Sequence, residues 1–236
     1  MSVTTVLFDL DGTLLPMDQE LFMKAYFGGL SKRLAPYGYE PKSLIDAIWT
    51  GTRAMVKNDG KENNETVFWK AFADIFGERV YGDLSKFEDY YVHDFDGVAK
   101  SCGVAPEAKE TVDALKSRGM RVVLATNPLF PSIATEKRIA WAGLDPKDFE
   151  LFTTYENSCH CKPNLDYYRD ILRTIGVSAE ECLMVGNDVD EDMVAQELGM
   201  KVFLLTDCLI NKSGTDVNRY PHGGFTELKR YLETLS

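Results

Sequence analysis

Residues 3–15 set the architecture expected of this chain, and they read Val3-Thr4-Thr5-Val6-Leu7-Phe8-Asp9-Leu10-Asp11-Gly12-Thr13-Leu14-Leu15. The apolar, partly β-branched run that ends at Phe8 predicts a buried strand. Fully buried strands usually belong to parallel sheets, which carry their chemistry at the carboxyl ends of the strands. Asp9 lies at that end, and in an extended chain Asp11 points to the same side. Gly12 then allows a sharp turn.

Two carboxylates this close repel each other unless a cation neutralises them. Ligation by oxygen atoms alone favours Mg²⁺. We therefore expect Asp9 to act as a nucleophile. We expect Asp11 to give a proton to a leaving group and later to take one from water. The alternative is a solvated acidic turn, which a position directly after a buried strand and before Gly12-Thr13 disfavours.

The six residues from Asp9 to Leu14 resemble the first motif of the haloacid dehalogenase superfamily. Most members of that superfamily are Mg²⁺-dependent phosphatases that work through an aspartyl-phosphate. The resemblance implies catalytic roles for Asp9 and Asp11, with Gly12 and Thr13 in support. It becomes specific when the three further motifs of the superfamily follow in order.

Two polar positions later in the chain match the second and third motifs. Thr126 follows an apolar run, where its hydroxyl can donate to a phosphate oxygen, and Asn127 can assist. Lys162 precedes Pro163 at the start of a predicted helix. Its charge would neutralise both the phosphate and Asp9. Pro163 in the first helical turn would hold Lys162 just outside the helix.

The fourth motif is an acidic run after another apolar segment, Gly186-Asn187-Asp188-Val189-Asp190-Glu191-Asp192. The superfamily usually has Asp directly after the glycine, so Asn187 departs from the pattern. In one register Asp188 is the metal ligand, with Asp9 and the Asp11 carbonyl, and Asp192 steadies the site and Lys162. In the other register Asn187 binds the metal through its amide oxygen. A charged ligand balances Mg²⁺ better and favours Asp188. The helix dipole accounts for part of the acidic run.

The chain contains two parts with different hydrophobic patterns. From residue 99 onward, predicted strands alternate with predicted helices. We expect strands at 120–125, 182–185 and 201–205, a short strand or extended segment at 149–154, and helices at 106–117, 131–142, 164–175, 190–198 and 227–235. This alternation predicts an α/β fold with a doubly wound parallel sheet. Residues 16–98 show helical spacing and hold more than half of the aromatic residues, which predicts four or five helices.

We therefore predict a core of residues 1–15 and 99–236, with residues 16–98 inserted as a helical cap. An insertion between the first and second motifs resembles the C1-type cap of phosphoglycolate-phosphatase-like and β-phosphoglucomutase-like members. In such members the cap closes over the substrate and excludes water. Most of the cap aromatics should form a bundle core.

Charge and cysteine content narrow the classes of partner. The 236 residues carry a formal net charge of −11, which argues against nucleic acid or an anionic membrane as partner. We expect neither a signal peptide nor a membrane-spanning helix. Five cysteines, an odd number, suggest reduced thiols in the cytoplasm. Cys159-His160-Cys161 lacks the second pair of ligands that a structural zinc site needs.

Together these features predict a cytoplasmic, Mg²⁺-dependent phosphatase, monomeric or dimeric, that acts on a small phosphorylated metabolite. In a closed site we expect the pKa of Asp11 to be shifted upward. Two alternatives stay open: a phosphomutase on the same scaffold, and a non-catalytic binding or regulatory protein with an altered metal site. A dehalogenase is disfavoured, because those members lack the second acidic residue.

Overall fold

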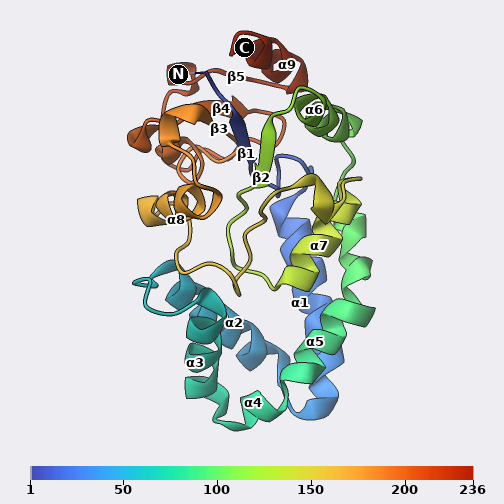
Figure 1. The fold of residues 1–236 in the computed structure, drawn as a ribbon. Helices are drawn as coiled ribbons and strands as arrows, with labels where there is room; N and C mark the ends of the chain where they lie inside the picture. The colour runs from blue at the N-terminus through green and yellow to red at the C-terminus, as the bar shows by residue number, and fades with distance from the viewer. Residues whose placement is uncertain (1, 236) are drawn as a thin grey trace.

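A computed structural model describes residues 2–235 and contains a parallel sheet of five strands, drawn at the top of Figure 1. The strands are β1 (Thr5–Phe8), β2 (Arg121–Leu124), β3 (Cys182–Gly186), β4 (Lys201–Leu205) and β5 (His222–Gly223). Their order in the sheet is β2-β1-β3-β4-β5. Because β1 lies between β2 and β3, the residues that follow these three strands gather at one edge of the sheet.

Helices cover both faces of the sheet. One face packs against α6 (Pro106–Ser117), α7 (Ser132–Trp141) and α9 (Phe225–Glu233). The other face packs against α8 (Leu165–Ile175) and the 3-10 helix Met193–Leu198. Side chains of β1 alternate between these layers, with Val6 and Phe8 on the first face and Leu7 on the second. The predicted doubly wound α/β fold is confirmed.

The segment predicted as a cap is helical, and we keep the name cap for residues 16–98. It contains five α-helices, α1 (Gln19–Leu34), α2 (Pro41–Val56), α3 (Asn64–Phe76), α4 (Arg79–Gly82) and α5 (Leu84–His93), at the bottom of Figure 1. Buried aromatic rings, among them Tyr26, Phe72 and Tyr90, form an apolar cluster of their own. Across residues 2–235, none of the helices combines the length and the apolar character needed to cross a membrane.

Backbone contacts join the cap to the core at two places. Met17 and Cys102 form an antiparallel bridge, so the chain enters and leaves the cap side by side. At the other end, the first backbone N–H groups of α3 donate to core carbonyls, from Asn64 to Ser158 at 2.8 Å and from Glu65 to Tyr155 at 2.8 Å. These bonds satisfy helix N–H groups that have no partner within the helix.

One sequence-based expectation about secondary structure is wrong, and one short strand was not expected. Residues 149–154, predicted as a short strand or an extended segment, run beside β2 and form the single bridge of Leu124 with Phe152 before the chain turns at residues 154–157. The helix predicted at 190–198 is the 3-10 helix Met193–Leu198. The Asp188 carboxylate accepts the N–H groups of Asp190 and Glu191, which holds the preceding loop in a turn. The short strand β5 was not predicted.

Candidate active site

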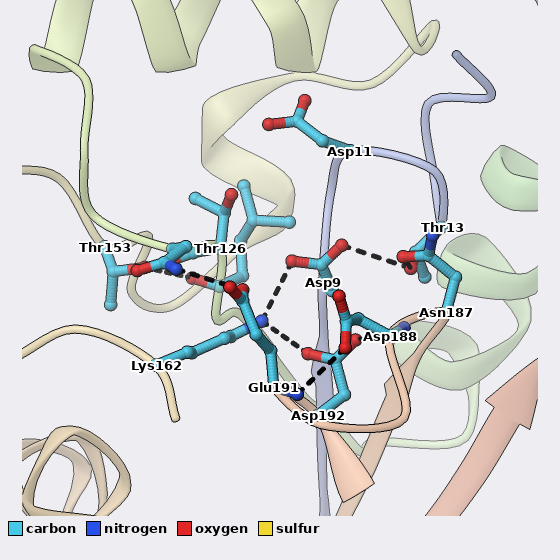
Figure 2. Close-up of polar contacts among 12 residues, drawn as sticks. Asp9, Asp11, Thr13, Thr126, Thr153, Lys162, Asn187, Asp188, Glu191 and Asp192 are labelled. Atoms are coloured by element: carbon cyan, nitrogen blue, oxygen red, sulfur yellow. Dashed lines mark hydrogen bonds and ion pairs between the residues drawn. The ribbon is translucent and has the colours of Figure 1, made fainter. Parts of the chain in front are cut away.

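Asp9 and Lys162 form the centre of the site at the carboxyl edge of the sheet. Lys162 Nζ donates to Asp9 Oδ1 at 2.9 Å and to Asp192 Oδ1 at 2.6 Å (Figure 2). The Lys162 and Asp192 side chains are each 1% exposed. Burial alone would lower the pKa of Lys162, but the two carboxylates hold that pKa well above its usual value. The site therefore has a fixed cation beneath Asp9.

The loop after Lys162 differs from the prediction. Asn164 is the N-cap of α8, and its side chain accepts the backbone N–H of Asp166 at 2.9 Å. Pro163 therefore precedes the helix instead of lying in its first turn. Asn is a strongly preferred N-cap residue, and with Asn164 as the N-cap the helix begins at Leu165.

The turn after β1 fixes the second oxygen of Asp9. Thr13 Oγ1 donates to Asp9 Oδ2 at 3.2 Å, and it also lies 3.0 Å from Asn187 Oδ1. Gly12 has a φ of +89°, and a Cβ at this position would lie 2.3 Å from Asn187 Nδ2. Only glycine fits both the backbone conformation and the space. Thr13 thus holds the Asp9 carboxylate by a hydrogen bond, and Gly12 permits the turn that brings Thr13 there.

Asp11 is turned away from Asp9 in this structure (Figure 2). Its Oδ2 forms an ion pair with Arg138 of α7, a side chain that is fully buried against the Phe130 ring. Asp11 Oδ1 is buried without a hydrogen-bond partner among residues 2–235. Burial raises the pKa of Asp11, and the Arg138 guanidinium opposes that shift. The direction is the one expected from the sequence.

Thr126 and Asn127 follow β2 and face the same region. Thr126 is buried, and its carbonyl accepts the hydroxyls of Thr153 at 2.6 Å and Tyr167 at 2.8 Å. Asn127 Nδ2 donates to Glu191 Oε2 at 3.0 Å, and Asn127 Oδ1 is buried without a partner in the described residues. Burial raises the pKa of Glu191 to about 7, with Lys162 opposing the shift.

The two candidates of the fourth motif have different surroundings. Both polar side-chain atoms of Asn187 have neighbours in the protein, since Oδ1 lies 3.0 Å from the Thr13 hydroxyl and Nδ2 donates to the Cys208 carbonyl at 2.7 Å. Asp188 Oδ1 accepts two backbone N–H groups, and Asp188 N donates to Asp192 Oδ2 at 3.0 Å. In Figure 2, Asp188 lies beside Asp9 whereas Asn187 lies next to Thr13.

One cavity of about 300 Å³ joins these groups. Most of the residues predicted for the site line it, namely Asp9, Asp11, Thr126, Asn127, Asn187, Asp188 and Asp192. Lys162 does not line the cavity but donates a hydrogen bond to Asp9, which does. The cap contributes Gln19, Phe22, Met23 and Trp49 to the cavity wall. The structure thus brings together all the side chains that the four motifs singled out.

Other residues of the site were missed by sequence reasoning. Arg138 lies inside an ordinary helical pattern, and Glu191 lies in an acidic run that the helix dipole also explains. Ile210 and Lys212 line the cavity from a loop that was expected to cross the sheet edge without a function. The loop is held there because Ile210 pairs with the backbone beside Asp188. No local pattern marks any of these four positions.

The oxygen donors beside Asp9 suit a hard divalent cation. They are the carboxylates of Asp9 and Asp188, which line the same cavity, and hard cations such as Mg²⁺ prefer oxygen ligands. The Asp11 backbone carbonyl and the Asn187 amide oxygen are the neutral oxygens that the sequence predicts for such a site. Over residues 2–235, no cluster of three or more His, Cys, Asp or Glu side chains is arranged around a common metal position. A cation here would therefore depend on two carboxylates and on neutral oxygens.

Several curated proteins are similar to most of this chain, among them two phosphatases. A glyceraldehyde 3-phosphate phosphatase of Methanocaldococcus jannaschii is 31% identical over 198 residues, which is 80% of this chain and 82% of that protein. A ribulose-1,5-bisphosphate 5-phosphatase of Halopiger xanaduensis is 26% identical over 208 residues, 85% of this chain and 84% of that protein.

A solved structure and a family model extend the comparison. The crystal structure of a 2-haloacid dehalogenase from Pseudomonas syringae pv. Tomato covers 99% of this chain and 100% of that one, with a TM-score of 0.64 and 19% identity, and it shows that the fold is shared. A family model for haloacid dehalogenase-like hydrolases matches residues 3–199. As the order of the four motifs predicted, the chain belongs to the haloacid dehalogenase-like hydrolase family.

Proposed function

We propose that this protein is a Mg²⁺-dependent phosphatase that hydrolyses a small phosphomonoester through an aspartyl-phosphate on Asp9. The observation that carries the proposal is the placement of Asp9. Its carboxylate lies at the end of β1, opens onto the cavity and is fixed by Lys162 and Thr13. A carboxylate held in one orientation beside a buried cation is prepared to attack an anionic phosphoryl group. The names of both curated relatives, which are phosphatases, support the same reaction class.

In the first step an Asp9 oxygen would form a bond to phosphorus while the bond from phosphorus to the ester oxygen breaks. Asp11 would give its proton to the departing alkoxide. The Thr126 hydroxyl and the Asn127 Nδ2 amide group, which in this structure donates to Glu191, would donate to the phosphoryl oxygens. Lys162 would compensate the charge that builds up next to Asp9.

In the second step Asp11 would take a proton from water, and the resulting nucleophile would release inorganic phosphate from Asp9. Both steps need the Asp11 carboxyl to face the phosphorus. Its ion pair with Arg138 must therefore open, and the side chain must turn toward Asp9. The arrangement in this structure is then a resting form of the acid.

Mg²⁺ held by Asp9, Asp188 and the Asp11 carbonyl would supply positive charge at the phosphoryl oxygens. Members of the family typically use a divalent metal, and the oxygen donors described above agree with that requirement in their chemistry.

The test is hydrolysis of p-nitrophenyl phosphate with Mg²⁺ and with EDTA, by the wild type and by Asp9→Asn. We expect Mg²⁺-dependent release of phosphate that falls by at least about 10³-fold in Asp9→Asn. Asp190→Asn makes the same chemical change at an exposed position of the fourth motif and should keep the wild-type rate. Retained activity in Asp9→Asn would remove the assigned nucleophile. Transfer of phosphate to a sugar instead of water would indicate a phosphomutase.

A further inference from the structure

A second cavity lies between the cap helices and the core, next to the active-site cavity. Its volume is about 150 Å³, and α1, α2, α3, α5 and the segment after β2 surround it. Met23, Trp49, Leu129 and Phe130 line both cavities. We call this second cavity the chamber. Since the two cavities share a wall, a group attached to a phosphate at Asp9 has the chamber as its neighbour.

The chamber has an apolar lining without charge. None of its lining residues is acidic or basic, and aromatic rings make up most of the wall. The hydroxyls of Tyr26 and Tyr91 lie 2.9 Å apart and bond to each other. Burial raises the pKa of Tyr26 to about 12, as expected where water is scarce. A hydroxylated group entering the chamber would give up its hydrogen bonds to water for few replacements.

The size of the chamber limits what can fill it. A protein cavity of roughly 150 Å³ with apolar walls stays dry and holds one benzene molecule. The chamber has that volume and that kind of wall. One ring, or an aliphatic group of similar bulk, would therefore fill it.

The positive charges of the site lie elsewhere. Lys162 is beneath Asp9, and Lys212 is on the wall of the active-site cavity. A second phosphate or a carboxylate directed into the chamber would find no cation among the lining residues, and Arg138, whose guanidinium lies 4.5 Å from the centre of the Phe130 ring, is paired with Asp11. The chamber therefore does not match the bisphosphate that the name of the Halopiger relative specifies.

We propose that the substrate is a phosphomonoester of an apolar alcohol, whose benzene-sized aromatic or aliphatic group occupies the chamber. The inference rests on the proposed function, because the chamber selects among esters only if the active site hydrolyses them. Burial of such a group would lower the free energy of the transition state as well as that of the bound ester, so it raises kcat/KM.

The first test uses the wild type and three esters with leaving alcohols of similar acidity: benzyl phosphate, methyl phosphate and glycerol 3-phosphate. We expect kcat/KM for benzyl phosphate to exceed that for glycerol 3-phosphate by about 100-fold, from the apolar area of one ring. Equal values, or a preference for glycerol 3-phosphate, would overturn the inference and leave the phosphatase proposal standing. If neither these esters nor p-nitrophenyl phosphate is hydrolysed, both proposals fail.

The second test fills the chamber. Thr52 of α2 lines the chamber but not the active-site cavity, so Thr52→Phe places a ring where the substrate's ring would lie. We expect the ratio of kcat/KM for benzyl phosphate to that for methyl phosphate to fall by at least about tenfold. Thr50→Phe is the matched control on the same helix, since Thr50 lines neither cavity and bonds to the Asp46 carbonyl at 2.9 Å.

The control should keep the wild-type ratio. If the folded Thr52→Phe variant also keeps it, the ring does not enter the chamber and the inference is wrong. If Thr52→Phe does not fold, which its thermal unfolding curve would show, the comparison of esters by the wild type decides alone.

Discussion

The edge of the sheet and the interior of the cap differ in charge: the sheet edge holds buried ion pairs, and the neighbouring cap interior holds a cavity without charged residues. At the sheet edge, buried charges compensate one another: Lys162 lies between Asp9 and Asp192, and Asp11 is paired with Arg138. In the cap, aromatic rings pack around an uncharged chamber. In the function proposed above, the sheet edge would hold the phosphoryl group, which every ester shares. The cap would contact the part of the ester that differs, so the two regions would divide reaction from selection.

This division predicts its largest effect at Lys162. Lys162→Met would remove the cation beneath Asp9 and leave two buried carboxylates facing each other. We expect kcat to fall by about 10²–10³-fold and the free energy of unfolding to fall by about 3–5 kcal/mol. Steady-state kinetics and urea unfolding measure the two changes separately.

Lys201→Met serves as the control, because Lys201 begins β4 and therefore lies at the amino ends of the parallel strands, away from the carboxyl ends where Asp9 lies. It removes the same charge far from Asp9 and should change kcat little. A Lys162→Met variant with kcat within a few-fold of the wild type would show that the sheet edge does not depend on its buried cation.

The same division explains what the sequence could and could not reveal. Asp9, Thr126 and Lys162 could be predicted because their segments resemble, in order, the motifs of one superfamily. Taken alone, Thr126 would be read as part of a turn and Lys162 as a surface lysine before a helix. Arg138 could not be predicted, because its helical position carries no sign that it lies buried against Asp11. The cap helices were predicted as a bundle, but which rings face a cavity depends on how the helices seat on the core. That information lies in tertiary contacts such as those of α3 with residues 155–158.

A second prediction concerns the exclusion of water from the interior of the cap. In the folded chain burial raises the pKa of Tyr26 to about 12, whereas an unfolded tyrosine titrates near 10. Between pH 10 and 12 the unfolded chain therefore loses this proton first, and the free energy of unfolding falls as the pH rises. At about 1.4 kcal/mol per pH unit, Tyr26 accounts for about 3 kcal/mol of the fall.

Urea unfolding of the wild type and of Tyr26→Phe across this pH range would measure that share. In Tyr26→Phe, the fall in the free energy of unfolding between pH 10 and 12 should be smaller than in the wild type by about 3 kcal/mol. Tyr81→Phe, at a side chain 42% exposed, should leave it unchanged. Identical alkaline curves for the wild type and Tyr26→Phe would mean that water reaches the ring, and the contrast between a dry cap and a charged sheet edge would weaken.

The smallest expected effect separates the two registers of the fourth motif. Asp188→Asn removes a negative charge beside Asp9, so we expect Mg²⁺ affinity, measured by calorimetry without substrate, to fall by at least about tenfold. Asn187→Asp would instead cost the hydrogen bond to the Cys208 carbonyl while leaving Asp188 in place. It should alter affinity less than Asp188→Asn does, and Asp190→Asn, at an exposed position of the same loop, should alter it least. If Asn187→Asp strengthens Mg²⁺ binding and Asp188→Asn leaves it unchanged, the ligand is residue 187. The side chain of Asp188 would then serve the turn whose N–H groups it accepts.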